Sequence, residues 1–168
     1  MSKIDEIAKV SRPVLGSDIP ILVFRAFRHF SSDYVDEVMG RATSTVFQNG
    51  GRAMGKELGE KIPKISLEEY LQSVIKMVEE LKIGVLRKVV VEEEKIVLAL
   101  DECITCAGMG NIGKRICHFE VGLVAGLVES FLGKKVRARE TKCNANGEGT
   151  CEVTVYINED LYQKERKS

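Results

Sequence analysis

Three cysteines and one glutamate in the last third of the chain have the residue types and spacing of a metal site: Cys117, Glu140, Cys143 and Cys151. The residues between Cys143 and Cys151 are Asn-Ala-Asn-Gly-Glu-Gly-Thr, which favour a hairpin turn. A hairpin brings its ends together, so these two thiols are predicted to lie close to each other. They would supply half of a tetrahedral metal site, and Cys117 and Glu140 can supply the other half.

The spacing alone leaves other interpretations open, because seven residues between two cysteines is not a standard zinc spacing. The three thiols can instead be small buried side chains that pack like other apolar groups. A disulfide is a further alternative.

The stretch also resembles a known family, the 4-vinyl reductase domain family, closely over residues 100–157 and loosely before them. This family is a small-molecule-binding module, found alone in archaea and as the sensor domain of regulators that respond to aromatic compounds. The shared features are Cys117, the helix Phe119–Leu132 with Gly122 and Gly126, then Gly133, Glu140-Thr-Lys-Cys143, Gly147–Gly149 and Cys151.

The resemblance implies a set of ligands and a fold. In aromatic-sensing members, three Cys and one Glu at this spacing hold a structural zinc, which here implies Cys117, Glu140, Cys143 and Cys151 as zinc ligands. The resemblance also implies a fold similar to Golgi vesicle-tethering subunits and haem-based nitric oxide sensors.

One ion at these residues makes a demand on the backbone. In a regular strand Glu140 and Cys143 point to opposite faces, because they are an odd number of residues apart. The strand is therefore predicted to bulge or end at Thr141–Lys142. Three thiolates favour zinc, and four protein ligands would make the ion structural.

Two further cysteines, Cys103 and Cys106, have a chelating spacing of their own. They can be buried thiols at a strand end, alternate ligands or residues that support the ligands, with Cys106 in place of Glu140 as one option. Iron bound in an iron–sulfur cluster of the five thiols is another, and so is a redox pair. His118 beside Cys117 is a further alternate ligand. His29 can be a haem ligand only by analogy of fold, and an ordinary histidine is the simpler interpretation.

The composition bounds the class of protein. The 168 residues predict a single domain, 1–168, with a family-like binding core at about 85–157. Lys plus Arg and Asp plus Glu both number 25, so no basic face for nucleic acid is expected. The sequence shows neither a signal peptide nor a membrane-spanning apolar run, and five cysteines fit a reducing, cytoplasmic location.

The apolar periodicity predicts an α+β fold, with helices on one face of an antiparallel sheet of about four strands. The helices are expected at 21–30, 34–62 with a bend at 49–51, 67–81 and 115–132. The strands are expected at 85–91, 96–100, 134–142 and 151–157, with a frayed tail from 158. Two stripes of small residues, Gly51-Gly55-Gly59 and Gly122-Gly126-Ser130, predict that their helices cross closely, within one chain or between two copies. Room for a ligand is the alternative.

No catalytic constellation, P-loop or dinucleotide-binding motif is present, so no enzymatic activity is expected. We expect the domain to bind or sense a small apolar molecule, a hydrocarbon or an aromatic compound, and to form a homodimer. The predicted pocket residues are Phe24, Phe27, Phe47, Tyr70, Val74 and Phe119. A thiol-based redox protein or enzyme that uses Cys103 and Cys106, and a protein–protein interaction module without a ligand, are the alternatives.

Overall fold

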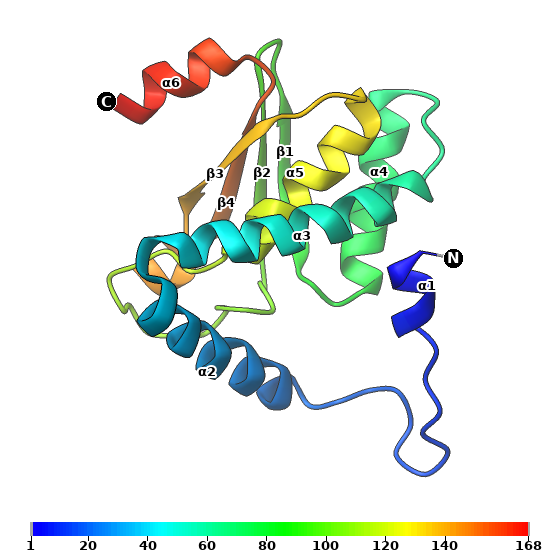
Figure 1. The fold of residues 1–168 in the computed structure, drawn as a ribbon. Helices are drawn as coiled ribbons and strands as arrows, with labels where there is room; N and C mark the ends of the chain where they lie inside the picture. Colours follow the sequence, from blue (N-terminus) through cyan, green and yellow to red (C-terminus); the bar gives the residue numbers. More distant parts are fainter. Residues whose placement is uncertain (1, 168) are drawn as a thin grey trace.

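Four antiparallel strands form one sheet in the order β1-β2-β4-β3 (Figure 1). The computed structural model describes residues 2–167, with the side chains of residues 2–165. The strands are β1 (Val85–Val91), β2 (Lys95–Asp101), β3 (Arg137–Lys142) and β4 (Cys151–Tyr156). The helices are α1 (Lys3–Ile7), α2 (Ile21–Met39), α3 (Thr43–Glu60), α4 (Leu67–Glu80), α5 (His118–Leu132) and α6 (Glu159–Lys167), with short 3₁₀ turns at Gly40–Ala42 and Asn144–Asn146. The predicted α+β class is confirmed.

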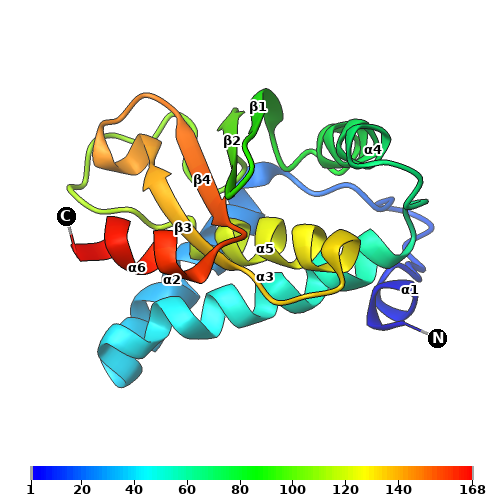
Figure 2. The same cartoon turned by 90° about the horizontal axis from the view of Figure 1, so that it is seen from above.

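The core lies between the sheet and α5. Alternate residues of β2 and β4 point toward α5, because side chains alternate between the two faces of a strand. They pack against the buried face of the helix in one cluster, which comprises Ile96, Leu98, Val121, Ala125, Val128, Val136, Val153 and Val155. Figure 2 shows the resulting layers: the sheet, then α5 along it, then α3 on the outer side of α5.

The two stripes of small residues bring α3 and α5 into backbone contact, as predicted for helices of one chain. A Cβ atom placed on Gly51 would lie 1.9 Å from the backbone oxygen of Phe119. One placed on Gly126 would lie 2.2 Å from the backbone oxygen of Arg52. Only glycine allows this approach, so α5 is held between the sheet and the backbone of α3.

The helix boundaries near the N-terminus differ from the prediction. Residues Ser31–Asp33 do not break the first helix, and α2 continues to Met39. The break comes at Gly40, which has a positive φ of 54° that glycine adopts without strain. The expected bend at 49–51 is also absent, because the glycines there lie inside α3, where α5 packs against them.

The C-terminal residues form a helix where a frayed tail was expected. α6 returns toward β4, and the ring centroid of Tyr162 lies 5.3 Å from that of Tyr156. The hydroxyl of Tyr156 donates a hydrogen bond to Glu165 at 2.7 Å. These contacts explain why the charged segment is ordered.

Candidate metal centre and adjoining cavity

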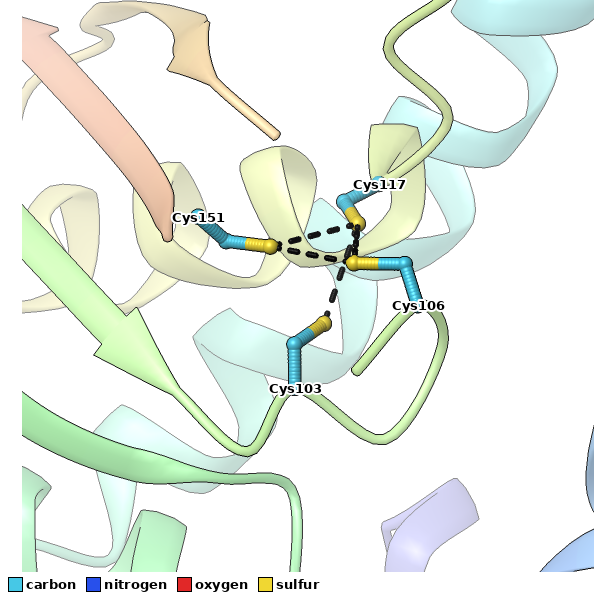
Figure 3. Close-up of side chains that lie close together, drawn as sticks. All are labelled: Cys103, Cys106, Cys117 and Cys151. Carbon is cyan, nitrogen blue, oxygen red and sulfur yellow. Dashed lines mark hydrogen bonds between the residues drawn. The ribbon is translucent and has the colours of Figure 1, made fainter. Parts of the chain in front are cut away.

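All five cysteines gather at one end of the sheet, although they come from separate segments of the chain. Cys103 and Cys106 lie in the loop after β2, Cys117 directly precedes α5, Cys143 follows β3, and Cys151 begins β4. All are buried and free, and the close-up in Figure 3 shows four of them with their sulfur atoms pointing toward one another. The fold therefore creates a closed cluster of thiols.

The sulfur atoms are spaced as ligands of one small ion would be. The Sγ atom of Cys117 lies 3.4 Å from that of Cys106, 3.7 Å from Cys103, 3.8 Å from Cys143 and 3.9 Å from Cys151. Around a tetrahedral zinc with Zn–S bonds of about 2.3 Å, two sulfurs would be about 3.8 Å apart. The shortest separation, 3.1 Å between Cys106 and Cys151, is far longer than a disulfide bond.

Two sets of four buried residues have ligand atoms that all lie within 4.8 Å of one another. One is Cys117, Glu140, Cys143 and Cys151, and the other is Cys103, Cys106, Cys117 and Cys151. The first is the set that the family resemblance implies, and both share two thiols. Such short separations suit a single ion better than an iron–sulfur cluster, which spreads its thiolates over several iron atoms.

Glu140 and Cys143 reach the same centre because β3 is irregular between them. The register of β3 against β4 shifts between Glu140 and Lys142, so the predicted irregularity at Thr141–Lys142 is confirmed. The Oε2 atom of Glu140 accepts a hydrogen bond from the Cys117 N–H at 3.2 Å. Its Oε1 atom is buried and has no hydrogen-bond partner among the described residues. An unsatisfied buried oxygen of this kind fits a position beside a cation.

An ion pair joins the two loops that carry the thiols. The Arg115 Nε donates to Glu148 at 3.0 Å, and the same carboxylate accepts the Cys143 N–H at 2.8 Å. The Arg115 guanidinium holds the pKa of Glu148 at about 2. The segment before α5 is thereby fastened to the turn before β4.

A small apolar cavity of about 40 Å³ lies between α4, α5 and the sheet. Residues from all three elements line it, including Val78, Leu98, Leu123, Leu127 and Val153. Its wall also contains Cys103, Cys117, Cys151 and Glu140. The cavity and the thiol cluster therefore share one wall.

Two of the six predicted pocket residues, Tyr70 and Val74, line this cavity. Both are buried on α4, and the Tyr70 hydroxyl donates to the backbone oxygen of Leu127 on α5 at 2.7 Å. This hydrogen bond ties α4 to α5 across the edge of the cavity.

The other four predicted pocket residues lie outside this cavity. Phe24 and Phe27 are on α2, which lies away from the sheet, and Phe27 is 74% exposed. Phe47 packs its ring against the guanidinium of Arg28 at 4.0 Å. Phe119 points from α5 toward α3, where its ring is near Gly50. Aromatic character alone did not indicate which side of a helix faces the sheet.

Glu120 is a lining residue that the sequence-based prediction missed. It is buried in the first turn of α5, where its Oε1 accepts the Thr105 hydroxyl and its Oε2 has no partner among the described residues. Burial raises the pKa of this carboxyl. A signal was present in the sequence, because an acidic residue in an otherwise apolar helix is expected to be buried with it.

The thiols share protons within the cluster. Contacts with Cys106 and Cys117 lower the pKa of Cys103, whereas contacts with Cys103 and Cys106 raise the pKa of Cys117. Burial raises the pKa of the Glu140 carboxyl to about 9. A metal ion that binds here must displace protons from these groups, as thiolate and carboxylate ligands require.

The two histidines lie apart from the thiol cluster. His118 begins α5 and lines a polar groove next to α2, and His29 lies within hydrogen-bonding distance, 3.1 Å, of the backbone oxygen of Thr105. Among the described residues, neither belongs to a group that can hold an ion. Histidine ligation therefore has no support in this arrangement.

Residues 96–156 match the model of the 4-vinyl reductase domain family. Relatives of the whole chain come from the archaeon Methanocaldococcus jannaschii. The uncharacterized protein MJ0150 is 35% identical over 148 residues, which are 88% of this chain and 82% of that protein. The uncharacterized protein MJ1642 is 29% identical over 85% of this chain and 81% of its own length.

Three solved structures share the fold at low identity. The phenol-responsive sensory domain of the transcription activator PoxR, solved with phenol, has a TM-score of 0.62 and 15% identity, covering 88% of this chain and 81% of that one. A vinyl-4-reductase family protein from Methanocaldococcus jannaschii has a TM-score of 0.55 and 19% identity, with 86% and 85% covered.

The third structure is a trafficking protein particle complex subunit 3 from Naegleria fowleri, covalently bound to palmitic acid. It has a TM-score of 0.63 and 15% identity, with 83% of this chain and 95% of that one covered. The sequence match, the archaeal relatives and the shared fold together show that the chain belongs to the 4-vinyl reductase domain family.

Proposed function

We propose that this protein is a sensor domain that binds a small apolar molecule in the cavity between α4, α5 and the sheet. The observation that carries the proposal is the position of the cavity, which is apolar, buried and in contact with the thiol cluster. The phenol-responsive domain of PoxR, which shares the fold, supports the same role. The proposal involves binding and no reaction.

The size of the cavity indicates how binding could produce a signal. A cavity of about 150 Å³ accommodates benzene in an engineered protein, whereas this one measures about 40 Å³. An aromatic ligand must therefore move α4 or the loop that carries Cys103. The conformational change that a sensor needs would follow directly from entry of the ligand.

We also propose that the thiol cluster holds one structural zinc ion. The thiolates of Cys117, Cys143 and Cys151 would be ligands, with Glu140 as the fourth, supported by its unpartnered Oε1. Zinc would neutralise buried thiolates and join three segments of the chain, which would otherwise depend on the ion pair of Arg115 with Glu148.

Toluene and phenol, added separately to the metal-loaded protein, test the ligand proposal. Each probe that binds should raise the thermal unfolding midpoint, because a ligand at about 100 times its Kd stabilises the folded state by about 2.7 kcal/mol. Val74→Phe narrows the cavity and should abolish this shift, whereas Val46→Phe, at a position on α3 that is 43% exposed, should leave it unchanged. The proposal fails if neither probe shifts the midpoint, or if Val74→Phe responds like the parent protein.

Native mass spectrometry tests the zinc proposal. One zinc ion per chain is expected, and Cys117→Ser should lose it. A protein that is folded and free of metal after purification in the presence of zinc would contradict the proposal.

We propose that the partner of α2 is a second copy of the chain. The helix exposes a row of large apolar side chains, namely Leu22, Phe27, Phe30, Tyr34 and Val38. An apolar surface of this kind marks an interaction site, and it also supports the alternative of an interaction module. Light scattering should report a dimer for the parent protein and a monomer for Phe30→Glu.

The alternative of a reactive thiol pair has less support. Cys103 and Cys106 are both 0% exposed, whereas reactive thiols are partly accessible. Slow alkylation of the folded protein at neutral pH is therefore expected. Among the described residues no helix is long and apolar enough to cross a membrane. We propose a cytoplasmic location, which the five free thiols support.

A further inference from the structure

The thiol cluster offers more donors than one ion can use. Five sulfur atoms and one carboxylate lie in two overlapping sets of four, and both sets contain Cys117 and Cys151. A tetrahedral ion takes four ligands. Two donors must therefore stay outside the shell at any one time, and the geometry indicates which positions they compete for.

Cys106 lies as close to the shared thiols as a ligand would. Its sulfur is 3.1 Å from that of Cys151, 3.4 Å from Cys117 and 4.0 Å from Cys143. These three separations bracket the distance of about 3.8 Å between two sulfurs on one tetrahedral zinc. Cys106 can therefore complete a shell with the same three thiols that Glu140 would complete.

Cys103 is placed differently. Its sulfur lies 3.7 Å from that of Cys117, and it belongs to neither set through a contact with Cys143. It also forms part of the wall of the apolar cavity, whereas Cys106 does not line that cavity. Cys103 is therefore the matched control: it is the same residue type, in the same loop, and equally buried.

Glu140 faces both the ion and the cavity. One carboxylate oxygen is held by the Cys117 N–H, and the other has no partner in the described part of the chain. The free oxygen can bind the ion, or it can turn to a polar group that enters the cavity. In the second case the ion would need another ligand.

We propose that the metal centre has two interchangeable fourth ligands, the Glu140 carboxylate and the Cys106 thiolate, around a fixed set of Cys117, Cys143 and Cys151. This inference rests on the zinc site of the proposed function and goes beyond it, because it assigns Cys106. Exchange replaces one metal–oxygen bond by one metal–sulfur bond, and the thiol proton of Cys106 passes to the released carboxylate. No change of oxidation state is involved.

The exchange would couple the cavity to the loop between β2 and α5. When Glu140 leaves the ion, Cys106 moves toward it and draws the loop inward. Thr105, which binds Glu120 in the cavity wall, is the neighbour of Cys106 and would move with it. A change on the cavity side would thus reach the surface next to α2, where Arg25 and His29 contact the carbonyl oxygens of the same loop.

Cobalt(II) in place of zinc tests the proposal, because its sulfur-to-metal charge-transfer absorption grows with the number of thiolates bound. Glu140→Gln should bind one cobalt with four thiolates, and Cys106→Ala should bind one with three. The charge-transfer intensity of Glu140→Gln should therefore exceed that of Cys106→Ala by about one third. The double variant Cys106→Ala/Glu140→Gln should bind cobalt at least about 100-fold more weakly than either single variant.

The control is the pair Cys103→Ala and Cys103→Ala/Glu140→Gln, which should match the parent protein and Glu140→Gln, respectively. The proposal is overturned if Glu140→Gln shows the three-thiolate intensity, or if the Cys103 control loses intensity in place of the Cys106 variant. Absence of tetrahedral cobalt from the folded parent protein would overturn the zinc site itself. Tetrahedral cobalt that depends on Glu140 and is unaffected by Cys106→Ala would overturn only the exchange.

Discussion

The contact between α3 and α5 gives two neighbouring glycines opposite responses to the same substitution. A Cβ atom on Gly51 would lie 1.9 Å from the backbone oxygen of Phe119 and 2.8 Å from the backbone nitrogen of Leu123. A Cβ atom on Gly50 would meet only the ring of Phe119, at an ordinary contact distance of 3.6 Å. Both positions are inside α3.

The expected magnitudes follow from these distances. Alanine favours a helix interior over glycine by about 1 kcal/mol, so Gly50→Ala should stabilise the protein by up to about that amount. Gly51→Ala gains the same helix propensity, but the two backbones must move apart by more than about 1 Å, and overpacking costs about 1–3 kcal/mol or more. Because both neighbours are backbone atoms, we expect the upper end of this range and a net loss of about 2 kcal/mol.

The assay is chemical unfolding of the metal-loaded protein, followed by circular dichroism. A loss of about 2 kcal/mol corresponds to a midpoint about 4–8 °C lower in a parallel thermal scan. Gly126→Leu, on the facing helix, should lose several kcal/mol, since even its Cβ atom would lie 2.2 Å from the backbone oxygen of Arg52. A Gly51→Ala protein within about 0.5 kcal/mol of the parent would refute the close contact.

Three further predictions concern polar groups near the cavity and the thiols. Glu120→Gln should stabilise the protein more at pH 8 than at pH 4, because burial raises the pKa of the carboxyl and folding must then oppose its ionisation as the pH rises; urea unfolding at both values checks this. Arg115→Gln should remove the stability that the pair with Glu148 provides above about pH 4.5 and that the parent loses as pH falls toward 2, measured as a smaller difference from the parent in acid than at pH 7. Tyr70→Phe should cost about 1–2 kcal/mol in thermal unfolding, because the buried backbone oxygen of Leu127 loses a donor; an unchanged midpoint would contradict that role.

The sequence indicated the parts of this fold in which local pattern and packing agree. The glycine stripes predicted the crossing of α3 with α5, since small residues every fourth position have few other uses in a helix. The odd spacing of Glu140 and Cys143 predicted the irregularity in β3, because a regular strand cannot turn both toward one point.

The errors arose where tertiary contacts override local preference. Gly50 and Gly51 suggested a bend, yet α5 packs against the helix there and keeps it continuous. The aromatic residues Phe24 and Phe27 suggested a pocket, but α2 lies outside the helical layer that covers the sheet. The position of Cys106 could not be deduced, because the loop after β2 contains several glycines and has no periodic pattern.

The tight seat of α5 has a mechanical consequence for the domain. With the sheet on one side and the bare backbone of α3 on the other, α5 behaves as a rigid beam that cannot shift sideways without breaking contacts on both flanks. α4 is held more lightly: a groove lined by Leu67, Leu71, Ile75, Val89 and Val91 separates part of it from β1. Swelling of the interior would therefore displace α4 outward like a hinged panel, while the beam keeps the thiol end of the sheet in place.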